Sequence, residues 1–92
     1  MFRAPFAMTI TGIDCIVNAA TSTVITVQEA DADCGTPVAV EAAITCATTM
    51  TTEAAGIDNA GIDAGDCITV LRGTNTGSPT QVMVTIEYTK ND

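Results

Sequence analysis

Hydrophobic and polar side chains alternate along the chain, most clearly near its C-terminal end. In the segment Thr80–Thr89, Val82, Val84, Ile86 and Tyr88 fall on one face, and mostly polar side chains fall on the other. Period-two alternation with one polar face predicts a half-buried antiparallel strand. We therefore expect this strand to belong to the core of a sheet rather than to an interface.

Other short apolar runs predict further strands. The segment Val38–Thr45 is ambiguous, because residues 41–43 would suit a helix, but its short length and strand-like neighbours favour a strand. Residues 48–52 are polar and β-branched. The clearer runs are Met8–Ile10, Ile13–Val17 (parted from the first by Gly12), Thr23–Glu29 and Cys67–Leu71.

Turn-forming residues separate these runs at short intervals. Residues 31–37 are a turn cluster, and residues 73–79 are expected to form a loop. A near-repeat of five residues, 55–59 and 60–64, indicates two turns that each bury one isoleucine. The pattern predicts an all-β fold, a small antiparallel β-sandwich or barrel with about six to eight short strands. We expect one such domain over residues 7–92, preceded by an N-terminal arm at residues 1–6.

Composition supports strands over helices. Thr, Val and Ile together account for 34 of the 92 residues, whereas Leu71 is the single leucine. β-Branched side chains suit a pleated sheet, while a helical protein of this size would use several leucines. The aromatic residues are Phe2, Phe6 and Tyr88, so we expect a thin aliphatic core.

Charge and missing residue types exclude several functions. The net charge is −8, which disfavours nucleic acid and anionic membrane surfaces as partners. No segment approaches the ~20 apolar residues of a membrane span, and none resembles a signal peptide, so we expect synthesis in the cytoplasm. Histidine is absent, and the two serines, Ser22 and Ser78, fall in predicted loops. We therefore expect no catalytic residues and no cofactor.

The four cysteines, Cys15, Cys34, Cys46 and Cys67, have no Cys-x-x-Cys spacing, so a zinc site is not expected. A disulfide between Cys34 and Cys46 would staple a predicted hairpin. The alternative is four reduced thiols in a protein made in the cytosol. Cys15 and Cys67 lie among apolar residues, and we expect both to be small buried hydrophobic side chains.

The segment Asp31–Gly35 has alternating aspartates followed by a glycine, which is one feature of calcium-binding loops. Its third acidic position is Cys34, and no glutamate stands where such a loop closes. An ordinary turn, in which the carboxylates accept hydrogen bonds from local backbone amides, explains the segment better. We expect no metal ion here.

Two motifs stand out in the C-terminal third: residues 60–71 contain an Ile-x-Ala-Gly-Asp turn that feeds a strand, and residues 76–88 contain a glycine-centred loop before an alternating strand that ends in an aromatic residue. In these motifs the chain resembles the end of small bacteriophage virion proteins. Residues 24–31 and 40–46 also fit this group, although Cys67 stands where relatives often carry an aromatic or aliphatic residue. The group consists of jelly-roll-like β-sandwich domains used as head decoration (cement) proteins, head fibres and tail-fibre modules.

The resemblance implies a capsid decoration protein without catalytic residues. We expect a homotrimer on the capsid surface of the virion, where it contacts the major capsid protein and bridges its subunits. The apolar N-terminal arm, Phe2, Arg3, Pro5, Phe6 and Met8, is expected to dock on the capsid. Two alternatives stay open: a fibre or receptor-binding module, and a subunit of an extracellular filament held by strand donation.

Overall fold

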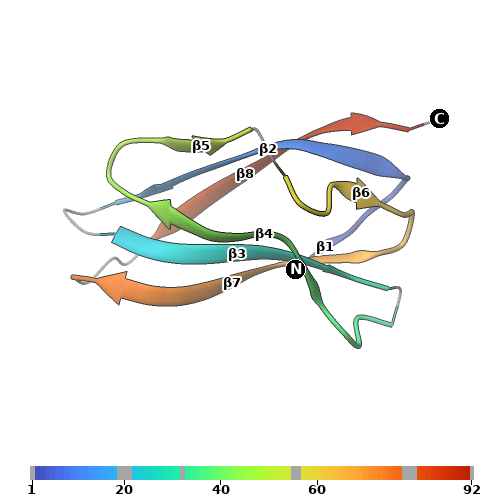
Figure 1. The fold of residues 1–92 in the computed structure, drawn as a ribbon, viewed down its shortest axis with the longest axis horizontal. Helices are drawn as coiled ribbons and strands as arrows, with labels where there is room; N and C mark the ends of the chain where they lie inside the picture. The colour runs from blue at the N-terminus through green and yellow to red at the C-terminus, as the bar shows by residue number, and fades with distance from the viewer. Residues whose placement is uncertain (1, 19–21, 32, 55–56, 78–80, 92) are drawn as a thin grey trace.

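The computed structural model describes residues 2–18, 22–31, 33–54, 57–77 and 81–91 (Figure 1). Within these ranges the chain forms eight strands and no helix, as the alternation of apolar and polar residues predicts. The strands are β1 (Phe2–Arg3), β2 (Met8–Val17), β3 (Ser22–Ala30), β4 (Val38–Cys46), β5 (Thr51–Glu53), β6 (Gly61–Ile62), β7 (Cys67–Thr76) and β8 (Val82–Lys90).

The strands form two antiparallel sheets. The first sheet has the order β1-β7-β3-β4, and it is the lower layer in Figure 1. In the second sheet β2 is central: residues 13–15 of β2 pair with β5 and also with β8, and residues 8–9 pair with β6 and also with β8. β5 and β6 therefore share one edge of β2, and β8 occupies the other. The predicted small antiparallel β-sandwich is confirmed.

The core is aliphatic and lies between the two layers. Ile13 of β2, Ile25 and Val27 of β3 and Val40 of β4 are all completely buried. They recur at every second position along β2 and β3 because successive side chains of a strand point to opposite faces. Burying each such side chain contributes about 1.5–3 kcal/mol, so this small set supplies much of the hydrophobic stabilisation of the fold.

β2 is one continuous strand, although two runs parted by Gly12 were expected. The register of β2 against β8 shifts between Ile10 and Gly12, and the pairing continues on both sides of this bulge. A Cβ at Gly12 would lie 2.9 Å from Oε2 of Glu87, so the missing side chain leaves room for that carboxyl group. Glycine here permits a close approach between strands, and the strand does not break.

β7 also runs further than the sequence indicated. Residues 73–76, expected in a loop, continue the strand and pair with the start of β3, where Thr23 lies opposite Asn75. The Thr23 hydroxyl is completely buried and donates a hydrogen bond to Oδ1 of Asn75, which satisfies it. The end of the expected loop, residues 78–79, lies outside the described part of the chain.

The near-repeat buries its two isoleucines unequally. Ile62 of β6 is 2% exposed, whereas Ile57 is half-buried against the core, and residues 55–56 lie outside the described ranges. The predicted alternation in β8 holds for Val82, Val84 and Ile86, which are half-buried between exposed neighbours, whereas Tyr88, predicted to share their face, is 50% exposed. The expectation that this strand belongs to the core is corrected: β8 is a partly buried edge strand, because among the described residues it pairs only with β2.

Candidate functional site

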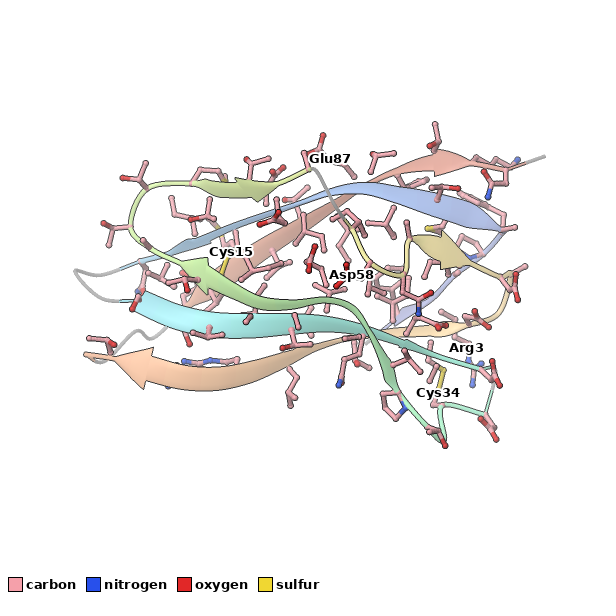
Figure 2. All side chains as sticks on the ribbon, viewed as in Figure 1. Arg3, Cys15, Cys34, Asp58 and Glu87 are labelled. Carbon is pink, nitrogen blue, oxygen red and sulfur yellow. A yellow bond between two sulfur atoms is a disulfide. The ribbon has the colours of Figure 1, made fainter. Side chains whose placement is uncertain are left out.

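Two disulfides join parts of the chain that are distant in sequence, and neither is the expected Cys34–Cys46 pair. Cys15 of β2 pairs with Cys46 of β4, and Cys34 pairs with Cys67 at the start of β7; the Cα atoms are 5.5 Å apart in both. In Figure 2, Cys15 lies between the layers and Cys34 lies in the loop before β4. The first bridge ties one sheet to the other, and the second ties this loop to β7.

The expected pairing is wrong because Cys34 and Cys46 flank the same strand. β4 is nine residues long, and a strand rises about 3.3 Å per residue, so its two ends lie roughly 26 Å apart. A disulfide requires Cα atoms within about 7 Å of each other. The expectation that Cys15 and Cys67 are buried is confirmed, since they are 0% and 1% exposed.

The residues expected to form a separate docking arm are built into the sandwich. Phe2 and Arg3 form β1 and pair with the start of β7. The next residue, Ala4, is 2% exposed; its N–H donates to the Asp66 carbonyl at 2.9 Å, and its carbonyl accepts from the Gly65 N–H at 2.7 Å. The expectation of an arm separate from the domain is therefore wrong, and residues 2–3 form a short edge strand. The physical reason is that unpaired backbone groups beside a sheet edge gain hydrogen bonds when they pair with that edge.

The five predicted docking residues divide into exposed and buried ones. Phe2 is 46% exposed, and Arg3 and Pro5 are exposed as well. Phe6 is half-buried against the core, with Nζ of Lys90 5.1 Å from its ring centroid. Met8 lies in β2 at 2% exposure, so it cannot contact a partner without unfolding the strand.

The loop at Asp31–Gly35 has the geometry of a turn. Asp33 accepts the Gly35 N–H at 2.9 Å, and the Asp31 carbonyl accepts the Cys34 N–H at 2.7 Å. Cys34 has a φ of 58°, an unusual conformation for a residue other than glycine, and its disulfide to Cys67 anchors it there. Within the described residues, no three acidic, cysteine or histidine side chains form a group that could hold a metal ion.

One pair of carboxyl groups, those of Glu29 and Asp66, lies near this loop. Asp66 is 8% exposed and accepts the Asp63 N–H, while Asn59 donates to Glu29 at 3.3 Å. Burial, followed by the hydrogen bond and charge of Asp66, raises the pKa of Glu29 above its ordinary value of 4.5. The two carboxyl groups therefore bring β3 and the segment before β7 close together.

A second carboxyl pair lies on the outer face of the other sheet, where Figure 2 labels Glu87. The hydrogen bond and charge of Asp14 raise the pKa of Glu87, which is an exposed group. One oxygen of Asp14, Oδ1, is buried and has no hydrogen-bond partner among the described residues. The raised pKa of Glu87 reflects the repulsion between two carboxylates on adjacent strands.

Exposed apolar side chains gather along the strands at one side of the sandwich. Val70 and Leu71 of β7 are 41% and 54% exposed, and Met83 of β8 is 57% exposed. We call the free edges of β7 and β8, residues 69–76 and 82–90, the β7–β8 side. Sequence patterning missed this surface. One signal was available: Val70 and Leu71 are adjacent, so they point to opposite faces, and an apolar residue on both faces is typical of a contact surface.

A shallow hollow of about 130 Å³ adjoins this side at the start of β8. Its lining consists of Ile16, Val17, Asn18, Gln81 and Met83, and most of that lining is apolar. The volume suits one aliphatic side chain and is well below that of a typical small-molecule pocket. The hollow therefore favours contact with another protein surface.

None of the described segments forms a helix long and apolar enough to cross a membrane. The described residues thus present two disulfides, two pairs of neighbouring carboxyl groups and an edge with exposed apolar side chains. No protein-family model, no curated protein and no solved structure matches this chain.

Proposed function

We propose that the chain is a non-enzymatic structural protein of a bacteriophage virion, a decoration protein that forms trimers on the capsid surface and bridges major capsid subunits. The sequence pattern in residues 60–71 and 76–88 supports this proposal. The observation that carries most weight is that two disulfides cross-link a small sandwich that exposes several large apolar side chains.

The disulfides suit a protein that works outside the reducing cytosol. Each closes a loop of more than thirty residues, 31 for Cys15–Cys46 and 33 for Cys34–Cys67. Disulfides persist in oxidising surroundings, which virion surfaces encounter after release from the host. A protein made in the host cytoplasm and oxidised on the particle would gain stability where it is needed.

The mechanism would be mechanical. A protein that binds only the assembled shell stabilises the shell by mass action, and the effect grows with its affinity. Contact area with two neighbouring capsid subunits would resist their separation under internal pressure. Phe2 and Arg3 are the exposed members of the predicted docking set that lie together on a strand, β1, and they would make this contact.

The test is co-sedimentation of the purified chain with heads that lack it. Saturation at a fixed stoichiometry and a raised melting temperature of the heads are the expected results. Phe2→Ala should weaken binding, whereas Val38→Ala, at a β4 position with similar exposure (51% against 46%), should not. Substitution is preferred to deletion of residues 1–6, because Ala4 is buried and its loss would disturb the fold.

Failure to bind heads would reject the capsid role. Binding of the same protein to cells or glycans would then favour a receptor-binding module, and polymerisation that depends on residues 2–3 would favour a filament subunit. These three outcomes are distinct, because each uses a different partner.

A further inference from the structure

The free edges of β7 and β8 lie on the same side of the sandwich. Four residues, 47–50, connect β4 in the first sheet to β5 in the second, and the two strands are in contact. β4 is one edge of the first sheet, and β5 shares an edge of the second, so the opposite edges, β7 and β8, face the other side. The five residues 77–81 join these two strands directly.

Both edges lack a partner strand in the part of the chain that the structure describes. β1 pairs with β7 only at residues 67–68, so the edge from Thr69 to Thr76 is open, and β8 pairs only with β2. The register of β8 against β2 is regular from Val82 to Glu87. A long, regular edge strand is a template for pairing with another chain, because its outward N–H and C=O groups have no partner.

The opposite edge of the first sheet is irregular by comparison. The pairing of β3 with β4 shifts register twice and Ala43 of β4 has a φ of 59°, whereas the pairing of β3 with β7 shifts once, between Thr23 and Ile25. Bulges of this kind twist an edge away and oppose strand addition. Strand pairing between molecules is therefore favoured at the β7–β8 side.

The sandwich is also incompletely closed along this side. Val70 lies opposite Val27 in the register, so it points toward the interior, yet it is 41% exposed while Val27 is completely buried. Val84 and Ile86 of β8 also point inward and are only half-buried. Covering such solvent-exposed apolar side chains with another protein surface removes them from water and stabilises the contact.

Charge identifies the partner as a second copy of the chain. The molecule carries −8 overall, so two copies repel unless they meet where acidic residues are scarce. From Thr69 to Thr76 and from Val82 to Lys90 the charged residues are two bases, Arg72 and Lys90, and one acid, Glu87. Two such sides repel each other less than the acidic remainder of two copies would, and the β7 edge of one copy can place Arg72 toward the β8 edge of the next.

We propose that copies of this chain bind one another through the β7–β8 side, which faces the three-fold axis of the trimer. The proposal rests on the self-association included in the proposed function, but it does not need the capsid. It assigns Val70, Leu71 and Met83 to the contact between copies, and it leaves β1 to contact other proteins.

The test uses matched glutamate substitutions at exposed apolar positions, followed by sedimentation equilibrium. Leu71→Glu and Met83→Glu introduce a carboxylate on the β7–β8 side, and each should raise the dissociation constant of the oligomer about thirty-fold or more. Val38→Glu and Met50→Glu are the controls, because their positions are 51% and 54% exposed against 54% and 57%. The controls should leave the oligomer unchanged.

Hydrogen exchange of the unmodified chain gives a second measurement that needs no substitution. Amides on the outer edges of β7 and β8 should become protected as protein concentration rises, and those of β4 should not. A chain that stays monomeric, or controls that dissociate the oligomer as strongly as Leu71→Glu and Met83→Glu, would overturn the proposal. A monomer that still saturates capsids would overturn self-association and leave the capsid role standing, and an oligomer that ignores capsids would overturn only the capsid role.

Discussion

Removal of the Cys15–Cys46 disulfide should destabilise the protein more than removal of Cys34–Cys67. The two bridges close loops of nearly equal length, 31 and 33 residues. In the chain-entropy model each should contribute roughly 3.5–4 kcal/mol to the free energy of unfolding. Loop length alone therefore predicts no difference between the two double variants.

Burial of the sulfur atoms makes the difference. Cys15 and Cys46 are both completely buried and belong to the hydrophobic core, whereas Cys34 is half-buried in a loop. Replacing two core cysteines by alanine leaves small voids between the sheets and should cost about 1 kcal/mol more. The expected totals are about 5 kcal/mol for Cys15→Ala/Cys46→Ala and about 4 kcal/mol for Cys34→Ala/Cys67→Ala.

These losses are large for a chain of this size. A 92-residue domain has a free energy of unfolding of roughly 5–14 kcal/mol, so the first variant should lose about a third of it or more. Urea denaturation followed by circular dichroism gives both values, and thiol titration of the oxidised wild type under denaturing conditions should find no free cysteine. A cost below about 2 kcal/mol for the core pair, or equal costs for both pairs, would refute the argument from burial.

Two further predictions concern the carboxyl pairs. Because the pKa of Glu29 is raised in the folded protein, its stabilising contribution is present below its ordinary value of 4.5 and is lost as pH rises through the folded-state pKa. The urea concentration at the unfolding midpoint should therefore decrease as the pH is raised from 4.5 toward neutral, and Glu29→Gln should make this decrease smaller. A decrease of the same size in Glu29→Gln would contradict the assignment to Glu29. Gly12→Ala should destabilise the protein by about 1 kcal/mol, because its Cβ would lie 2.9 Å from Oε2 of Glu87. In a Glu87→Ala background most of this cost should disappear, and a cost that persists would place the strain in the backbone instead.

Secondary structure followed closely from local patterning in this chain. The alternation in residues 82–88 and the β-branched run at residues 23–29 correspond to β8 and β3, because side-chain period and propensity act between near neighbours. The ambiguous segment at residues 38–45 is β4, as its neighbours indicated. Strand ends were less predictable: β7 reaches Thr76 because its partner, β3, supplies Thr23 opposite Asn75.

The sequence by itself determined that this protein is a small, acidic, all-β protein, since strand periodicity and composition are local properties that survive in any arrangement of the strands. The tertiary structure alone decided which cysteines pair, that residues 2–3 join a sheet, and that β7 and β8 leave one side open. Each of these depends on which distant segments become neighbours. Cys15 and Cys46 meet across two layers although 31 residues separate them, and no local pattern encodes that distance.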